Sequence, residues 1–529
     1  MKNILLFIIA GFLLKGSFAQ SVTKTFDIKK RYLNIPIQKS ENRIKTYFLK
    51  GADTITYAVI RIADTKPDYW VYTDVSAFIG QKITIKFEGN ARGIESIYNA
   101  DVMIGSDSLY KEKLRPQFHF TTQRGWINDP NGLVYQNGIY HLFYQHNPYE
   151  TEWENMHWGH AISNDLLHWK ELPTALFPDK LGTIFSGSAV IDKQNDAGFG
   201  KNALLAFYTT AGKSMAQNVA YSLDSGKSFV KFAGNPIVGP DRDPKVFWHQ
   251  PTKRWVMALY NENTITIYNS IDLKKWVEVS KNKGFYECPE LFELDVDGNA
   301  NNKKWVMYAA SGTYMIGGFD GKKFTPTSGK FYYNWGTQYA AQTYNNTPYN
   351  RRIQIGWGRH EMPGMPFNQQ MLFPNQLSLK TTPQGVRLFC EPIKEISQLH
   401  GKSYAFKNIK APELNKYLDT IRGDLFHGIM DVELDKGLGI ELYFRGNPIL
   451  YFDGNFNRFN GAPYVCDGAP GSMRFTIEFL IDKNSVEGYV GGGKLFISDM
   501  LHIKNNQGLQ LIGDIKVHDF KLYEMNSIW

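Results

Sequence analysis

The chain has 529 residues, of which 43% are hydrophobic, 15% aromatic and 21% charged. At roughly 100–200 residues per domain, this length predicts about three domains, and the hydrophobic fraction excludes a disordered chain. The formal net charge is only +8 at pH 7. The basic residues are scattered along the chain, which argues against a nucleic-acid-binding protein. The many aromatic residues favour a β-rich fold.

The first nineteen residues have the features of a secretory signal peptide. Lys2 provides a positive charge, an apolar stretch covers residues 4–14, and small residues precede a cleavage site after Ala19. No cysteine follows that site, and no later segment is long and apolar enough to span a membrane. We therefore expect a secreted or periplasmic protein without a membrane anchor.

Residues 20–112 read as a small β module of their own. Polar and apolar residues alternate in strand fashion, for example over residues 57–62 and 83–87, and no motif of this region recurs elsewhere. The module either binds polysaccharide or packs against the rest of the protein, and we favour packing.

A motif of about 50 residues repeats between residues 113 and 385. Five strand-like phrases follow tight turns and start 64, 51, 50 and 48 residues apart, at residues 138, 202, 253, 303 and 351. Polar turns closed by an aromatic residue recur in step with them, with the aromatic residues at Trp169, Phe229, Trp276 and Phe324. Several short strands per repeat at this period are typical of a β-propeller, here with five blades.

Short strands separated by turn residues continue to the end of the chain. Examples lie at residues 439–444, 475–481 and 509–512. They predict a C-terminal β-sandwich over residues 386–529. The fold class expected for the whole chain is therefore all-β.

Candidate chemical groups come just before the repeated phrases, where the first strand of each blade should line the central channel. Asp129, Asp243 and Glu287 occupy this place in blades one, three and four. Like-charged groups that converge in one cleft are costly unless a ligand or a reaction requires them. Three carboxylates at matching positions therefore indicate a functional site.

Two kinds of chemistry use such carboxylates. A calcium site would need closely spaced aspartates of the EF-hand kind, which the sequence lacks; the three cysteines likewise have no metal-ligand spacing. We expect neither a metal nor another cofactor. Cleavage of a glycosidic bond needs two carboxyl groups, one of them protonated. The surrounding aromatic and amide residues suit a sugar: Trp126, Asn128, Gln145, Trp153 and Trp158.

The three carboxylate motifs, at residues 126–132, 242–244 and 287–289, resemble the signature motifs of glycoside hydrolase family 32 in order and spacing. The resemblance extends over about residues 113–529. This family comprises the β-fructosidases, which are invertases, inulinases and levanases, and its fold is a five-bladed propeller followed by a β-sandwich. The resemblance implies an exported, retaining hydrolase that releases fructose from levan or inulin, with sucrose as a further candidate substrate. An exo mode is expected over an endo mode.

The resemblance also implies roles for single residues. Asp129 matches the nucleophile, Glu287 the acid/base and Asp243 the transition-state stabiliser. A retaining mechanism implies that the carboxyl groups of Asp129 and Glu287 lie roughly 5–5.5 Å apart. The residues that match the fructose-binding groups are Asn128, Gln145, Trp153, Phe185, Ser186, Arg242 and Trp357.

Two segments at the expected rim of the pocket depart from the family pattern. They are residues 334–343 and 358–367. They leave open the linkage preference, β-2,6 or β-2,1, and the chain length of the substrate.

Other readings remain. An endo-acting levanase or inulinase would keep the same catalytic groups, whereas a non-catalytic fructan-binding protein would normally have lost one of them. Residues 222–229 resemble the Asp box of sialidases, but a sialidase also needs an arginine cluster. A hydrolase of arabinose or xylose polymers should lack the motif at residues 126–132.

Overall fold

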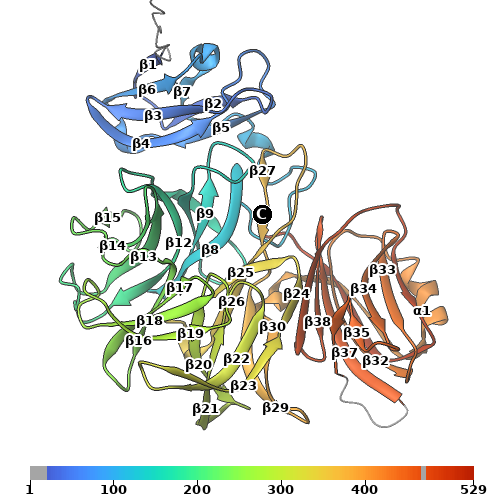
Figure 1. Ribbon diagram of the computed structural model, residues 1–529. Coiled ribbons are helices and arrows are strands. Elements are labelled where there is room, and N and C mark those ends of the chain that lie inside the picture. The colour runs from blue at the N-terminus through green and yellow to red at the C-terminus, as the bar shows by residue number, and fades with distance from the viewer. Residues whose placement is uncertain (1–20, 466–471) are drawn as a thin grey trace, which may run out of the picture.

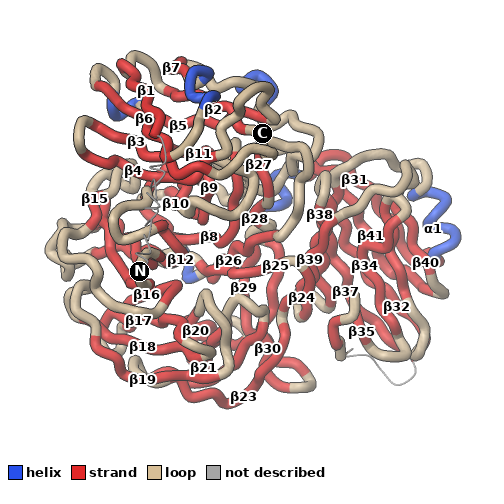
Figure 2. Tube along the Cα trace, turned by 45° about the horizontal axis from the view of Figure 1, so that its top comes forward, coloured by secondary structure: helices blue, strands red, loops and turns tan. Residues whose placement is uncertain are grey.

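The computed structural model describes residues 21–465 and 472–529, and strands dominate it (Figures 1 and 2). Within these residues the one α-helix is α1 (Ala411–Leu418). No helix in the described ranges is long and apolar enough to cross a membrane. The prediction of an all-β chain is confirmed. The predicted signal peptide lies outside the described residues.

The N-terminal module packs two sheets around a common core, at the top of Figure 1. In β6 every second side chain is buried, as Ile83, Ile85 and Phe87 show, which is the expected pattern of a half-covered strand. The first sheet has the order β1 (Ser21–Asp27), β6 (Lys82–Glu88), β3 (Ile44–Lys50) and β4 (Asp53–Ile60). The second has the order β5 (Tyr69–Asp74), β2 (Tyr32–Ile37) and β7 (Tyr98–Ala100).

Five groups of strands follow and form the blades of the propeller, and blades four and five share one sheet. The first two comprise β8 (Gly125–Gln136), β9 (Ile139–Asn147), β10 (His157–Ser163) and β11 (Lys170–Leu176), then β12 (Thr183–Asp192), β13 (Ala203–Ala211), β14 (Met215–Ser222) and β15 (Val230–Lys231). The third and fourth comprise β16 (Arg242–His249), β17 (Arg254–Asn261), β18 (Thr264–Ser270) and β19 (Val277–Lys283), then β20 (Glu290–Val296), β21 (Asn299–Tyr308), β22 (Thr313–Phe319) and β23 (Phe324–Tyr332). The fifth comprises β25 (Gln338–Thr343), β26 (Arg352–Gly358), β29 (Asn375–Thr382) and β30 (Gly385–Pro392).

The repeated phrases of the sequence correspond to fixed places in these blades. The strand-like phrase forms the second strand each time, namely β9, β13, β17, β21 and β26. The polar turn links the third strand to the fourth in blades one to four. In the turns of blades one to three a serine hydroxyl binds an aspartate, as in the 2.7 Å hydrogen bond from Ser222 Oγ to Asp224 Oδ1. The aspartate then accepts a backbone N–H that would otherwise lack a partner, which explains why the turn recurs.

Within blade five, the chain between β26 and β29 contacts blade one. β27 (Phe367–Asn368) pairs with β8 in parallel, and β28 (Gln370–Met371) pairs with β26. Blades four and five also touch through the pair Val296 and Leu379. Because β30 pairs with β29 along its whole length, we propose that the propeller extends to Pro392 rather than to residue 385.

The C-terminal part is a sandwich of two sheets, at the right of Figure 1. The larger has the order β24 (Asn334–Gly336), β39 (Leu495–Met500), β38 (Ser485–Val490), β37 (Ser472–Ile481), β32 (Phe426–Asp435), β41 (Ile515–Met525) and β31 (His400–Lys410). The smaller has the order β36 (Ala462–Pro463), β35 (Arg458–Phe459), β34 (Asn447–Asp453), β33 (Ile440–Phe444) and β40 (Leu509–Ile512). The edge strand β24 comes from the chain between blades four and five, so it joins the propeller to the sandwich.

A buried histidine fastens the start of the propeller to the sandwich. His119 Nδ1 lies 2.7 Å from Asp482 Oδ2, and its Nε2 lies 2.9 Å from Glu487 Oε1. The backbone N–H groups of Gln117 and Phe118 also donate to Asp482. Burial opposes the charged ring, but the two carboxylates raise the pKa of His119 to about 9.

Candidate active site

Three carboxylates from three blades meet at one end of the propeller channel. Asp129 lies in β8, Asp243 in β16, and Glu287 in the turn just before β20. Cys288 shows how close they are: its Sγ lies 3.6 Å from Asp129 Oδ2 and 3.7 Å from Asp243 Oδ2. Its backbone N–H also donates to Asp243 Oδ2 at 3.2 Å.

The backbone around these groups departs from regular strand geometry. Asp243, Glu287 and Cys288 have φ values of 62°, 30° and 46°, in the left-handed region that residues other than glycine seldom adopt. The register is shifted in β8, β12, β16 and β25, each time close to the site. Bulges of this kind turn side chains out of the sheet, and they are frequent beside active sites. The local backbone is what aims these side chains at one another.

Asp129 is held by neutral donors. Ser186 Oγ donates to its Oδ2 at 2.6 Å and Asn128 Nδ2 to its Oδ1 at 3.2 Å. Trp126 Nε1 in turn donates to Asn128 Oδ1 at 3.0 Å and fixes the orientation of that amide. Burial raises the pKa of Asp129, while the bonds from Ser186 and Asn128 act against this rise. The carboxyl is therefore oriented but carries no cation partner of its own among the described residues.

Glu287 has different partners. Arg242 Nη2 donates to Glu287 Oε2 at 2.9 Å, and the Tyr339 hydroxyl donates to Oε1 at 2.5 Å. The Arg242 guanidinium also stacks over the ring of Tyr260, 4.5 Å from its centroid. Burial and the neighbouring Glu287 raise the pKa of Tyr339, so the phenol keeps its proton and remains a donor.

Asp243 is the most strongly perturbed member of the cluster. Burial, followed by the charges of Asp129 and Glu287, raises its pKa to about 7. Arg242 Nε lies 3.6 Å from Asp243 Oδ2 and acts in the opposite direction. A carboxyl group perturbed by burial and by two like charges is the kind of group expected at a functional site.

Aromatic side chains stand around the cluster. Trp357 meets both Trp126 and Tyr339 edge to face, with 6.1 Å between ring centroids in each pair. Trp153 meets Phe185 in the same way at 6.0 Å, and 49% of its surface remains exposed. Such an arrangement provides apolar faces beside charged groups, which suits the faces of a sugar ring.

The structure brings most of the predicted residues together. Asn128, Ser186 and Arg242 bind the carboxylates directly. Gln145 is buried, and its amide nitrogen has no partner within the described ranges. The sequence reasoning also named Trp158 near the site, but this residue is fully buried and donates to the backbone oxygen of Phe185, so it belongs to the core.

The sequence did not predict the contacts that two further residues make with the three carboxylates. Tyr339 lies in the strand expected to line the channel in blade five, but only the fold reveals its hydrogen bond to Glu287. The contacts of Cys288 with both aspartates likewise emerge only from the fold. A second layer supports Trp357: its Nε1 donates to Gln369 Oε1, and Gln369 Nε2 donates to Glu361 Oε1. The nearest signal in the sequence was the departure from the family pattern at residues 358–367.

A five-bladed propeller with paired carboxyl groups and aromatic walls at one end of its channel is a scaffold for a glycoside hydrolase. Comparison with known proteins agrees. The sequence model of the glycosyl hydrolases family 32 N-terminal domain matches residues 119–392. The chain therefore belongs to glycosyl hydrolase family 32 and is a glycosidase.

Individual relatives support this assignment. A levanase of Bacillus subtilis is 37% identical over an alignment of 496 residues that covers 82% of this chain and 73% of the relative. An extracellular exo-inulinase of Aspergillus awamori is 36% identical over 389 residues, covering 60% of this chain and 72% of the relative. The crystal structure of an exo-inulinase from Aspergillus awamori superposes with a TM-score of 0.69 at 28% identity, covering 79% of this chain and all of that one. The structure of a β-fructofuranosidase of Schwanniomyces occidentalis complexed with fructosyl-erythritol also superposes with a TM-score of 0.69. Its sequence is 26% identical, and the match covers 78% of this chain and 98% of that one.

Proposed function

We propose that this glycosidase is an exported, retaining β-fructosidase that removes terminal fructose from β-fructans. The observation that carries the proposal is the pairing of Asp129 and Glu287 in one cluster with unlike partners. Asp129 receives neutral hydrogen bonds, whereas Glu287 is bound by a guanidinium and a phenol. A retaining glycosidase needs two carboxyl groups in one site, and we assign the nucleophile to Asp129 and the acid/base to Glu287 from the family motifs that they match.

The reaction would proceed in two displacements. In the first, a carboxylate oxygen of Asp129 bonds to the anomeric carbon of the terminal fructosyl unit, and the glycosidic C–O bond breaks as Glu287 gives its proton to the leaving oxygen. In the second, Glu287 takes a proton from water, and the water oxygen bonds to the anomeric carbon as the ester bond to Asp129 breaks. Fructose leaves, and both carboxyl groups return to their initial states.

Other residues would bind the fructosyl unit. Asp243 lies beside both reacting carboxyl groups and would hold sugar hydroxyls in the transition state. The buried amide of Gln145 has a free donor that a hydroxyl could satisfy. Trp153, Phe185 and Trp357 would supply the apolar walls.

The substrate class is proposed from the relatives. The proteins compared above are named levanase, exo-inulinase and β-fructofuranosidase. We propose levan or inulin as the substrate, with sucrose as a further one, and an exo mode. Export is proposed from the signal-like first nineteen residues and from relatives named as extracellular enzymes.

A product time course on levan, inulin and sucrose tests the proposal. We expect fructose as the sole early product, and the relative rates will identify the preferred linkage. Oligosaccharides at early times would instead show an endo-acting enzyme. If none of the three substrates yields a product, a non-catalytic fructan-binding protein becomes the better explanation.

A further inference from the structure

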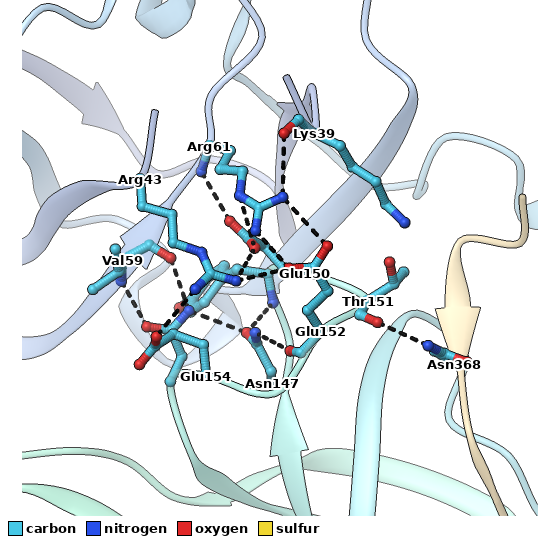
Figure 3. A network of polar contacts seen from close by, with 12 residues as sticks. Lys39, Arg43, Val59, Arg61, Asn147, Glu150, Thr151, Glu152, Glu154 and Asn368 are labelled. Atoms are coloured by element: carbon cyan, nitrogen blue, oxygen red, sulfur yellow. Dashed lines mark hydrogen bonds and ion pairs between the residues drawn. The ribbon is translucent and has the colours of Figure 1, made fainter. Parts of the chain in front are cut away.

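The loop between β9 and β10, residues 148–156, carries Trp153 and lies against the N-terminal module (Figure 3). The indole is half exposed, and among the described residues its one ring contact is with Phe185. Its position beside Phe185 and the candidate active site therefore depends largely on how the backbone of this loop is held.

Arg61 of the module binds the loop with its side chain and its backbone. Its Nη2 lies 2.6 Å from Glu152 Oε2, and its backbone N–H donates to Glu150 Oε1 at 3.2 Å. Its Nε lies 3.4 Å from Glu150 Oε2. The Glu150 side chain is nearly inaccessible, so this ion pair is shielded from solvent.

Arg43 of the module reaches both residues that flank the tryptophan. Its Nη2 lies 2.9 Å from Glu152 Oε2, and its Nη1 lies 3.4 Å from Glu154 Oε2. Figure 3 shows the two guanidinium groups facing the three loop glutamates. Single exposed ion pairs contribute little, but several charges in one network with forked geometry constrain a loop more strongly.

The two ends of the loop are also tied to the module. Asn155 Oδ1 accepts from the backbone N–H of Val59 at 2.6 Å, and Asn155 Nδ2 donates to the backbone carbonyl oxygen of Val59 at 2.8 Å. The side-chain amide thus makes the two backbone hydrogen bonds that a neighbouring strand would make. At the other end the Tyr149 ring stacks on Phe48 with 5.7 Å between centroids. These contacts make the loop part of the module's surface.

The propeller holds the loop from the opposite side. Asn147 Nδ2 donates to the backbone carbonyl oxygen of Glu152 at 2.8 Å. Asn368 Nδ2 donates to the backbone carbonyl oxygen of Thr151 at 3.0 Å. Asn368 also donates to Glu361, which binds the Gln369 amide under Trp357. The network thus connects the module with two walls of the pocket.

We propose that Arg43 and Arg61 are positioning residues, which hold Trp153 at the rim of the pocket through Glu152 and Glu154. The N-terminal module then completes the substrate site without contacting the reacting bond. This inference rests on the proposed function. It predicts that losing both arginines weakens substrate binding and leaves the chemical step largely intact, because the carboxylate cluster does not touch the module.

Steady-state kinetics on the preferred fructan test this role. The double variant Arg43→Ala/Arg61→Ala should raise KM by about 3- to 10-fold with little change in kcat, as expected when binding common to ground and transition state is lost. KM should rise less in Arg43→Ala/Arg61→Lys than in the double alanine variant. Lysine keeps the positive charge but lacks the two parallel N–H donors of a guanidinium. The matched control is Arg92→Ala, which removes an exposed pair with Asp64 in the same module.

A double-mutant cycle with Trp153→Ala decides whether the arginines act through the indole. The arginine substitutions should then have almost no further effect on KM in the Trp153→Ala background. An equal effect in both backgrounds, or no effect in either, would overturn the proposal.

Amide hydrogen exchange gives a readout that does not need turnover. Exchange across residues 148–156 should rise in the double arginine variant and stay unchanged in Arg92→Ala, and unchanged exchange in both would refute the positioning role. If the wild-type protein cleaves no fructan, the proposed function fails, while the exchange experiment still decides whether the arginines order the loop.

Discussion

Asp129 and Glu287 differ in the groups that bind them. Asp129 accepts from a serine and an asparagine, while Glu287 faces Arg242 and Tyr339. The roles proposed for them, nucleophile for Asp129 and acid/base for Glu287, can be separated with substrates that differ in their leaving group.

Glu287→Gln should lose most activity on fructan but much less on an aryl β-fructoside. An aryl leaving group needs little protonation, so the loss of the acid matters less. Asp129→Asn should lose at least about a thousandfold on both substrates, because no nucleophile remains. Rates on the two substrates, with melting temperatures as the folding control, provide the measurement. Equal losses on both substrates in Glu287→Gln would contradict the acid role.

Asp243→Asn should stabilise the protein above neutral pH while abolishing activity. The pKa of Asp243 rises from 3.8 to about 7 on folding, so the folded state binds more protons between these values and its stability falls as pH rises through that window. The variant avoids this loss, and asparagine tolerates the left-handed backbone at this position. Thermal unfolding should show a gain of at least about 2 °C at pH 8 and little or none at pH 4. If the melting temperatures of Asp243→Asn and the wild type differ by the same amount at pH 4 and pH 8, the titration of Asp243 does not explain the difference.

Among the elements, β24 stands out because it belongs to the propeller by sequence and to the sandwich by pairing. Asn334, Trp335 and Gly336 align in parallel with residues 496–498 of β39. Gly336 allows the close approach: its φ is 102°, and an added Cβ would lie 1.9 Å from the backbone oxygen of Ser498. No side chain fits there without moving one of the two strands.

Gly336→Ala should therefore lower the melting temperature by several degrees, since the clash is with backbone. Gly138→Ala is the matched control, because Gly138 also has a positive φ of 86° but nothing lies within 4 Å of its added Cβ. The difference between the two variants in thermal unfolding isolates the clash from the cost of the dihedral angle. Similar shifts in both would show that the junction tolerates the methyl group.

The elements also show how far sequence reasoning reaches. The repeated phrases identified the second strand of every blade, and the motif at residues 126–132 identified the strand that carries Asp129, because local patterns encode strands and turns. The hydrogen bond from Tyr339 to Glu287 could not be predicted, since it joins different blades. The same holds for the contacts of Arg43 and Arg61 with the loop glutamates, which are about a hundred residues away along the chain. Side-chain partners of this kind depend on the assembled fold.

At the scale of the whole molecule, His119 links the propeller to the sandwich. Its two ring nitrogens bind Asp482 and Glu487 in a buried setting. The raised pKa of about 9, against an ordinary 6.5, means that the folded state binds more protons between these values. The stabilisation is therefore complete below about pH 6.5 and is lost as pH rises through 9.

His119→Asn should destabilise the protein by about 3 kcal/mol near pH 6, because a cation between two buried carboxylates disappears. The deficit should shrink toward pH 9.5, where the wild-type ring has lost its proton. His168→Asn is the control, since its pair with Asp165 is exposed. Denaturant unfolding at the two pH values measures the free energy of unfolding of each variant. If His119→Asn is destabilised equally at both, the loss comes from packing and not from the charge of the histidine.

The hydrogen bonds from residues 117–119 to the sandwich also limit the order in which the chain can fold during synthesis. Gln117 meets Asp482, a partner that lies 365 residues further along the chain. At about 5–20 residues per second, the ribosome makes this partner roughly 20–70 s later. During that interval the segment before β8 lacks the Asp482 partner of His119 and of the Gln117 and Phe118 backbone N–H groups. The contacts that join the propeller to the sandwich can therefore form only after most of the chain has been synthesised.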